Sequence, residues 1–131
     1  MKGVNADFDF SFLQKNMIEG RLPDFSDSLS NDVVISQKVA SMLGLHTGSP
    51  LRVYFIIQDE VQPRGRKFNV CGIFNTGMAE FDKIYSVCDI RHLQKLNNWG
   101  DSLVSGYEIL LNDFNDLPVV MTDVNNTIYY D

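Results

Sequence analysis

The sequence has few of the motifs on which enzymes depend. It contains no G-x-x-x-x-G-K-[ST] phosphate loop, no G-x-G-x-x-G dinucleotide motif and no G-x-S-x-G nucleophile elbow. Its two histidines, His46 and His92, lie far apart, and its two cysteines, Cys71 and Cys88, have no C-x-x-C spacing. These absences argue against nucleotide hydrolysis and against a zinc site on this chain. We therefore expect a protein that is not an enzyme and that holds no cofactor and no metal.

Basic residues are also scarce. Lys and Arg number 11 against 17 Asp and Glu, which gives a formal net charge of −6 and a sequence pI of about 4.7. Nucleic-acid binding requires a basic surface that releases counterions from the phosphates, and anionic membranes attract basic segments. The charge balance therefore excludes nucleic acid as a partner and argues against binding to an anionic membrane surface.

Long apolar runs are absent as well. The longest, Val53–Ile57 and Ile109–Leu111, are the size of strands and far below the roughly 18–20 residues that span a bilayer. Met1–Phe10 lacks the apolar stretch of a signal peptide. Taken alone, these features indicate a cytoplasmic protein. An expressed piece of a membrane protein gives the same pattern, with Met1 as a cloning start.

The remaining pattern predicts one domain over residues 1–131. A chain of 131 residues with 44% hydrophobic residues has enough apolar surface for a core of its own. In the first half, the predicted elements are a helix at Asp7–Glu19, a loop at Asp24–Asp32, a strand at Val33–Ile35, a helix from the N-cap Ser36 to Leu43, a strand at Leu51–Gln58 and a hairpin tip at Asp59–Lys67.

The second half continues the alternation of strands and helices. The predicted elements are a strand at Phe68–Asn75, a loop at Gly77–Asp82, a strand at Lys83–Cys88, a helix capped by Asp89, a turn at Asn97–Ser102, a strand at Ser105–Leu111 and a helix that begins near Asp116. Two hairpins are implied, and the alternation is only partial. The order therefore favours an α+β fold, with a mixed or largely antiparallel sheet and three to four helices, over a doubly wound fold.

Candidate chemical groups are predicted to lie in solvent. We expect His92 on the outer face of its helix and His46 in a turn. Neighbouring carboxylates occur in predicted loops, where nothing shifts their pKa values apart as a catalytic pair requires. They are Asp59 with Glu60, and Glu80 with Asp82. A further acidic group, made up of Asp24, Asp27 and Asp32, lacks the residue order of a calcium loop.

The two cysteines allow two interpretations. If Phe68–Asn75 and Lys83–Cys88 form a hairpin, Cys71 and Cys88 lie opposite each other on neighbouring strands. A strained disulfide is then feasible, because neighbouring strands fit the preferred disulfide dihedral poorly. The alternative is two small buried thiols, and a shift of one residue in the pairing removes the juxtaposition.

Five local patterns, in order and spacing, cover almost the entire chain from Phe8 to Val124. They are Gly20–Pro23 followed by Asp32–Ser36, Ala40–Leu45 with Gly48, Arg66–Phe74, Tyr85–Leu96 and Ser105–Ile109. Together they resemble the extracytoplasmic domains of ABC-transporter permeases of the LolC/LolE, MacB and FtsX type. The chain departs from that pattern at Ser49, where these domains usually have Asp.

The resemblance implies a MacB-like periplasmic core domain, here as a fragment of a larger permease in the cell inner membrane. In such permeases the domain lies outside the membrane between the first two of four transmembrane helices. A separate cytoplasmic ATP-binding subunit moves it, and a second permease copy or a paralogue accompanies it. LolC/LolE-like members pass lipoprotein to a periplasmic carrier, MacB-like members drive efflux, and FtsX-like members activate cell-wall hydrolases. We expect a lipoprotein-releasing member that binds its cargo or a periplasmic protein and transmits force.

The hairpin tip is the candidate partner-binding site. It gives an apolar and basic surface to an acidic domain, and its residues are Val61, Gln62, Pro63, Arg64, Gly65 and Arg66. The segment Ile57–Lys67 is shorter than the protruding arm by which LolC-type domains grip their carrier, so that form of carrier recruitment is not implied. An ordinary solvated turn is the alternative.

Two other hypotheses remain open at this point. The chain is alternatively a free-standing binding module that uses a sheet edge or the Pro63 hairpin. A small hydrolase with carboxylates from different loops is the third hypothesis, and it requires a pocket in which such groups converge.

Overall fold

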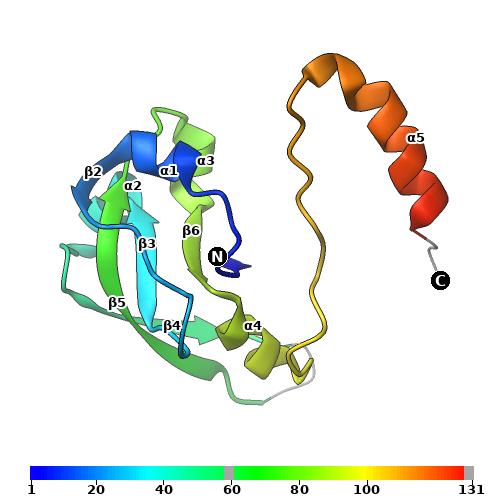
Figure 1. Ribbon diagram of the computed structural model, residues 1–131. Helices are drawn as coiled ribbons and strands as arrows, with labels where there is room; N and C mark the ends of the chain where they lie inside the picture. Colours follow the sequence, from blue (N-terminus) through cyan, green and yellow to red (C-terminus); the bar gives the residue numbers. More distant parts are fainter. Residues whose placement is uncertain (58–60, 129–131) are drawn as a thin grey trace.

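The computed structural model describes residues 1–57 and 61–128, and in these ranges the fold is α+β, as predicted. The strands are β1 (Lys2–Val4), β2 (Met17–Gly20), β3 (Asp32–Ser36), β4 (Pro50–Phe55), β5 (Arg64–Phe74) and β6 (Ser86–Asp89). The helices are α1 (Ser11–Asn16), α2 (Gln37–Leu43), α3 (Ala79–Ile84), α4 (Ile90–Asn97) and α5 (Leu117–Thr127). The sheet order is β1-β6-β3-β5-β2, with β4 also paired to β5, and Figure 1 shows the helices arranged around it.

The sheet is mixed because its central strand runs parallel to one neighbour and antiparallel to the other. β3 is parallel to β5 and antiparallel to β6, and β1 is parallel to β6. Val33, Val34 and Ile35 of β3 are 0% exposed. Val33 and Ile35 pack in one apolar cluster and Val34 in another, one on each face of the sheet. A strand covered on both faces is encoded by a continuous apolar run, which is how the sequence reads here.

Helix α2 follows β3 with the boundaries that the sequence predicts. The Ser36 hydroxyl accepts a hydrogen bond from the Val39 amide at 3.1 Å, and Gly44 ends the helix at φ 66°. Ala40 is buried, as expected, but Leu43 is 53% exposed. The expectation that Leu43 faces the core is therefore wrong, because the seven-residue helix turns its last residue away from the sheet.

Two glycines allow strand β2 to approach β5 closely. The Arg21 amide donates to the Cys71 carbonyl at 2.9 Å. A Cβ atom on Gly72 would lie 2.4 Å from both the Arg21 carbonyl oxygen and the Met17 Cε atom. Gly20 has φ 77°, which L residues rarely adopt, and its Cβ would also collide with the Cys71 carbonyl. This contact fixes β2 at the edge of the sheet.

Several predicted boundaries are wrong, and tertiary contacts explain why. The helix predicted at Asp7–Glu19 is shorter in the structure, where only α1 forms, because Met17–Gly20 pairs with β5 as a strand. The predicted loop at Gly77–Asp82 and the start of the strand at Lys83–Cys88 form α3, whose Phe81 ring stacks on Tyr85 with centroids 4.0 Å apart. Strand β5 begins at Arg64, four residues earlier than the strand predicted at Phe68–Asn75.

The predicted hairpin between Phe68–Asn75 and Lys83–Cys88 is also wrong. β3 lies between β5 and β6, so Cys88 pairs with Val33, and Val33 in turn pairs with Val70. Cys71 and Cys88 are both free thiols on strands that do not touch. Two free thiols, Cys88 buried and Cys71 partly buried, therefore replace the disulfide.

The C-terminal part leaves the sheet. Residues 98–116 connect α4 to α5, which lies apart from the body (Figure 1). Ser105–Leu111 was predicted as a strand, yet it pairs with no strand in the described part of the chain. The helix predicted near Asp116 is confirmed as α5, which has Pro118 in its first turn after the 3-10 turn Phe114–Asp116.

Replacing Gly72 by Ala should destabilise the fold, because the new Cβ overlaps backbone that cannot move away without breaking the β2–β5 pairing. We expect a loss of about 3 kcal/mol in the free energy of unfolding, measured by urea denaturation. Gly65→Ala is the matched control on the same strand, since its Cβ would make an ordinary 3.4 Å contact with Tyr54. Equal losses for the two variants would refute the role assigned to the close approach.

Candidate functional site

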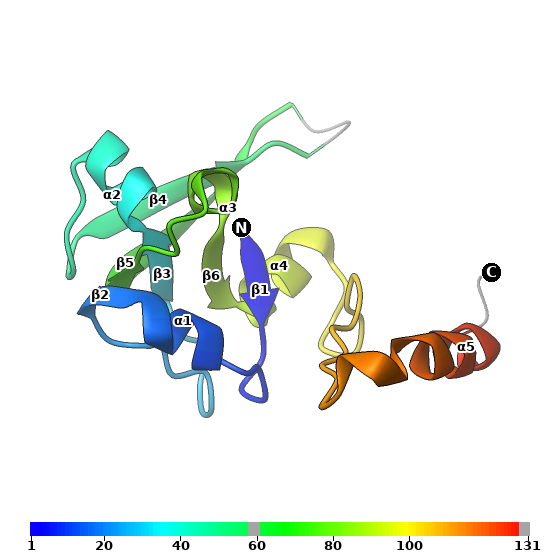
Figure 2. The same cartoon turned by 90° about the horizontal axis from the view of Figure 1, so that it is seen from above.

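The predicted partner-binding residues divide between a loop and a strand. Gln62 and Pro63 are exposed and Val61 is 100% exposed, beyond the strands of the β4–β5 hairpin. Arg64, Gly65 and Arg66 belong to β5 and not to the tip as predicted. Figure 2 shows the hairpin projecting from the body of the domain. Asp59 and Glu60, the acidic pair expected at the tip, lie outside the described residues.

The strand half of the hairpin is held by the fold. Arg64 lies opposite Phe55, and Arg66 lies opposite Val53. The Arg64 guanidinium donates from Nη1 to the Leu96 carbonyl oxygen at 2.5 Å, at the C-terminal end of α4. A cation at that end of a helix is stabilised by the free carbonyl groups and the helix dipole. In the described part of the hairpin, the exposed residues outside the strands are Val61, Gln62 and Pro63, and none of the three is charged.

Asp82 is buried, which corrects the expectation that it lies in solvent. Its Oδ1 atom accepts hydrogen bonds from the Thr76 hydroxyl at 2.8 Å and from the Thr76 amide at 3.3 Å. The Ser36 hydroxyl donates to the backbone carbonyl of Asp82. These bonds join α3 to the start of α2 beside a polar cavity of about 340 Å³. Asp82 thus has a structural role, while Glu80 is exposed and paired with Lys83.

The two thiols are protected from reaction. Burial raises the pKa of Cys71 to about 12 and the pKa of Cys88 to about 12. A thiol in this state carries almost no thiolate at neutral pH, and the thiolate is the nucleophile and metal ligand. The cysteines therefore act as small apolar side chains.

His92 is on the buried face of α4, not on the outer face as predicted. Its side chain is 4% exposed, its Nε2 atom lies 2.8 Å from the Ser30 carbonyl oxygen, and its ring meets Phe68 edge-on with centroids 4.8 Å apart. The apolar pattern of α4 places Leu96 in the core, and one turn earlier this face presents His92. His46 is exposed in its turn, in agreement with the prediction.

The buried Asp89 carboxylate forms an ion pair with the partly buried Arg91, and the sequence predicts only the capping role of Asp89. Asp89 was predicted as the N-cap of α4, and its carboxylate does accept from the Arg91 amide at 2.9 Å. The Arg91 side chain also returns to that carboxylate, with Nη2 2.6 Å from Oδ2. Burial by itself raises the pKa of Asp89, but the hydrogen bonds from Arg91 and Ser30 outweigh it and hold that pKa below its usual range. The pair is therefore ionised at neutral pH.

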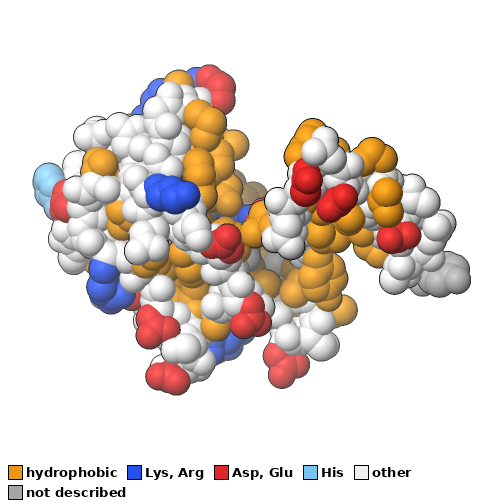
Figure 3. Space-filling view, turned by 45° about the horizontal axis from the view of Figure 1, so that its top comes forward, with side chains coloured by type: hydrophobic (Ala, Val, Ile, Leu, Met, Phe, Trp, Pro, Cys, Tyr) orange, Lys and Arg blue, Asp and Glu red, His pale blue; other side chains and the backbone are white. Residues whose placement is uncertain are grey.

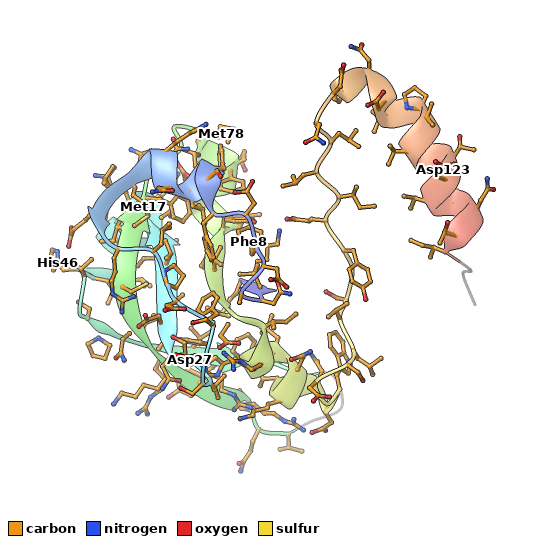
Figure 4. The ribbon with its side chains drawn as sticks, viewed as in Figure 1. Phe8, Met17, Asp27, His46, Met78 and Asp123 are labelled. Carbon is orange, nitrogen blue, oxygen red and sulfur yellow. The ribbon has the colours of Figure 1, made fainter. Side chains whose placement is uncertain are left out.

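Arg91 also holds the loop that leads into β3. Its guanidinium donates to the carbonyl oxygens of Phe25 at 3.1 Å, Asp27 at 2.8 Å and Ser28 at 2.8 Å. Asp27 is labelled in Figure 4, on this loop beside α4. A planar group with five donors suits several carbonyl oxygens at once, and a lysine does not replace it. Only the spacing of Asp89 and Arg91 around a helix start hints at this arrangement in the sequence.

Breaking this pair should cost far more than breaking an exposed one. Arg91→Met leaves the Asp89 carboxylate, which is 1% exposed, without its counter-charge, and we expect a loss of about 3 kcal/mol in the free energy of unfolding. The matched control is Arg21→Met at the exposed Arg21–Asp32 pair, for which a loss below about 1 kcal/mol is expected. Chemical denaturation at pH 7 measures both, and a similar cost for the two would contradict the assignment.

Stability should fall on mild acidification because of His92. Burial lowers the pKa of His92 below its ordinary value of 6.5. The unfolded chain therefore takes up the proton first, so stability is complete above pH 6.5 and decreases as the pH falls through 6.5. His92→Gln should flatten the slope of unfolding free energy against pH between about pH 7.5 and 5.5, while His46→Gln should keep it. An unchanged slope in His92→Gln would show that this prediction is wrong.

Two kinds of feature are missing from the described residues, a cluster of metal ligands and a membrane-spanning helix. In residues 1–57 and 61–128 no group of three His, Cys, Asp or Glu side chains is arranged to hold a metal ion. Nor does a helix in these ranges combine the length and apolar character that crossing a membrane requires. No protein-family model matches the chain, and no curated protein matches its sequence.

Proposed function

We propose that this chain is an extracytoplasmic domain of an ABC-type permease, of the lipoprotein-releasing kind, which binds cargo or a partner protein and transmits force. The observation that carries the proposal is the ordered set of sequence patterns from Gly20 to Ile109. In this proposal the parent protein lies in the inner membrane, and ATP is hydrolysed by a separate cytoplasmic subunit.

The positions of the patterns support the proposal, because they coincide with places where the backbone is constrained. The pattern at Ala40–Leu45 contains the left-handed Gly44, and Gly48 has φ 84°. Gly20 and Gly72, from two other patterns, meet at the close approach of β2 and β5. Patterns that coincide with such constraints reflect a shared fold better than isolated apolar matches do.

A binding role also fits the way the reactive groups are used. Asp82 and Asp89 are engaged in hydrogen bonds within the fold, and both thiols are protonated. The tip residues Val61–Pro63 are instead exposed, and Arg64, which directly follows them at the start of β5, is bonded to the end of α4. An exposed tip next to a strand end that the fold holds in place is suited to contact and to the transfer of force.

The alternatives within the same class differ in cargo. The short hairpin is compatible with a MacB-like efflux domain or an FtsX-like hydrolase-activating domain, and a free-standing binding module remains the alternative outside the class. The free-standing module uses either the hairpin or a sheet edge, so location in the cell is what separates it from the permease domains.

The direct test is the topology of the full-length gene product. An epitope inserted after Val61 should be accessible to antibody and protease on the outer side of the inner membrane in spheroplasts. The same epitope on a cytoplasmic ATP-binding subunit should become accessible only after lysis. A parent protein that is recovered entirely in the cytoplasm, with no bilayer-spanning segment next to residues 1–131, would end the proposal.

The hairpin tip should be the contact site for the cargo. A photo-crosslinking amino acid at Val61 of the full-length protein should label a lipid-modified protein or its periplasmic carrier in the membrane fraction. Met42, which is 72% exposed on α2, provides the matched position away from the hairpin. Labelling of the same proteins from both positions, or from neither, would reject the tip as the contact surface.

A further inference from the structure

The acidic charge of this protein is concentrated in its C-terminal part. Residues 1–95 contain 11 basic and 11 acidic side chains, whereas residues 96–131 contain six acidic and no Lys or Arg side chains. The net charge of −6 therefore belongs to residues 96–131, and five of the six carboxylates lie in residues 98–128, which we call the acidic arm. Figure 1 shows this segment reaching away from the sheet, with α5 at its end.

Part of the arm has a backbone without a hydrogen-bonding neighbour. Residues 104–112 belong to no helix or strand, and no backbone–backbone hydrogen bond in the described chain involves them. Gly106, Tyr107, Glu108 and Leu110 line a groove of about 520 Å³ against the body of the domain, whereas Ile109 and Leu111 line a cavity against α5. A segment with unpaired backbone groups can add to the open edge of a sheet as a further strand.

The exposed side chains of the arm are also those of an interface. Tyr107, Leu110, Phe114, Val119 and Met121 are each more than half exposed. Figure 3 shows hydrophobic side chains along the arm and on the side of the body across the hollow from it. An apolar surface of this kind next to acidic groups fits a partner that is apolar and basic.

The same chain offers such a surface at the outer edge of β4. In the described residues β4 pairs with β5 alone, so its other edge is open. Arg52 is exposed on β4, directly opposite Lys67 of β5. Like charges at directly opposite positions destabilise a sheet unless an acidic group lies beside them. Tyr54, also exposed, is the next residue on that face.

We propose that residues 104–111 of one copy pair, as an antiparallel strand, with the outer edge of β4 of a second copy, and that the exchange is reciprocal. A register that sets Glu108 beside Arg52 also sets Tyr107 beside Val53 and Ile109 beside Leu51. It places Gly106 next to Tyr54, which already has Gly65 on its other side. A single register therefore pairs the opposite charges, places apolar side chains beside each other and leaves space for the Tyr54 ring.

The structure favours a second copy over the chain's own β4. Lys2 of β1 donates to Glu108, which holds the arm beside the β1 end of the strand order. β4 joins the sheet at β5, three strands further along that order. Each copy carries one unpaired segment with Glu108 and one open edge with Arg52, so two copies satisfy both contacts at once. This inference does not depend on the proposed transport function.

The test is a reciprocal charge reversal, followed by sedimentation velocity over a wide concentration range. The wild-type chain should associate, and Glu108→Arg and Arg52→Glu alone should each weaken the association by at least about tenfold, since each sets like charges against each other twice. A mixture of the two variants should associate again, because every contact then joins opposite charges. A folding defect does not produce such recovery.

Two controls separate the contact from its surroundings. Lys2→Met removes the ion pair within the chain and leaves the proposed contact intact, so its association should equal that of the wild type. Circular dichroism of each variant should show the wild-type spectrum. A wild-type chain that stays monomeric at every concentration overturns the proposal, as does a mixture of the two folded variants that fails to associate. If the arm pairs with β4 of its own chain, or binds only an unrelated partner, the wild-type chain stays monomeric at every concentration.

Discussion

The burial of β3 on both faces and both edges is the constraint on which the rest of the structure depends. Its residues Val33–Ile35 are fully buried, β5 and β6 bind its two edges, and apolar clusters cover its two faces. Every connection into or out of this strand must then be fixed. Ser36 caps α2 immediately after it, and the loop before it is held by Arg91 and His92 of α4. Placing one short strand in the centre thus helps to fix the positions of α2, of α4 and of the loop before β3.

Local patterns in the sequence predict those parts whose cause is local. The run from β3 through α2 to the β4–β5 hairpin carries its own caps and turns, and Asp89 and Pro118 mark helix starts correctly. The predictions fail where pairing with a strand far away in the sequence determines the secondary structure. Met17–Gly20 has a helical pattern but pairs with β5. The insertion of β3 between β5 and β6 depends on residues about 35 to 55 positions apart, which no local pattern encodes.

In the candidate site, too, some features have a local cause and others depend on residues far apart in the sequence. Exposure of the tip at Val61–Pro63 follows from its turn residues, so sequence reasoning finds it. The roles of Arg64 and His92 depend on the carbonyl oxygens that the fold brings to them, and these are invisible in the sequence. The polar groups inside the domain thus stabilise it, while the surfaces that we propose for contact lie on the hairpin and on the acidic arm. Such a division fits the proposed role in binding and in transmitting force.

Hydrogen–deuterium exchange followed by mass spectrometry tests this division most directly. The account predicts the slowest exchange in β3 and in the segments of β5 and β6 that pair with it. It predicts fast exchange at residues 104–112 in dilute solution, where their amides have no backbone partner, and slower exchange there as the concentration rises. Strong protection of residues 104–112 at every concentration, or rapid exchange throughout β3, would contradict the account.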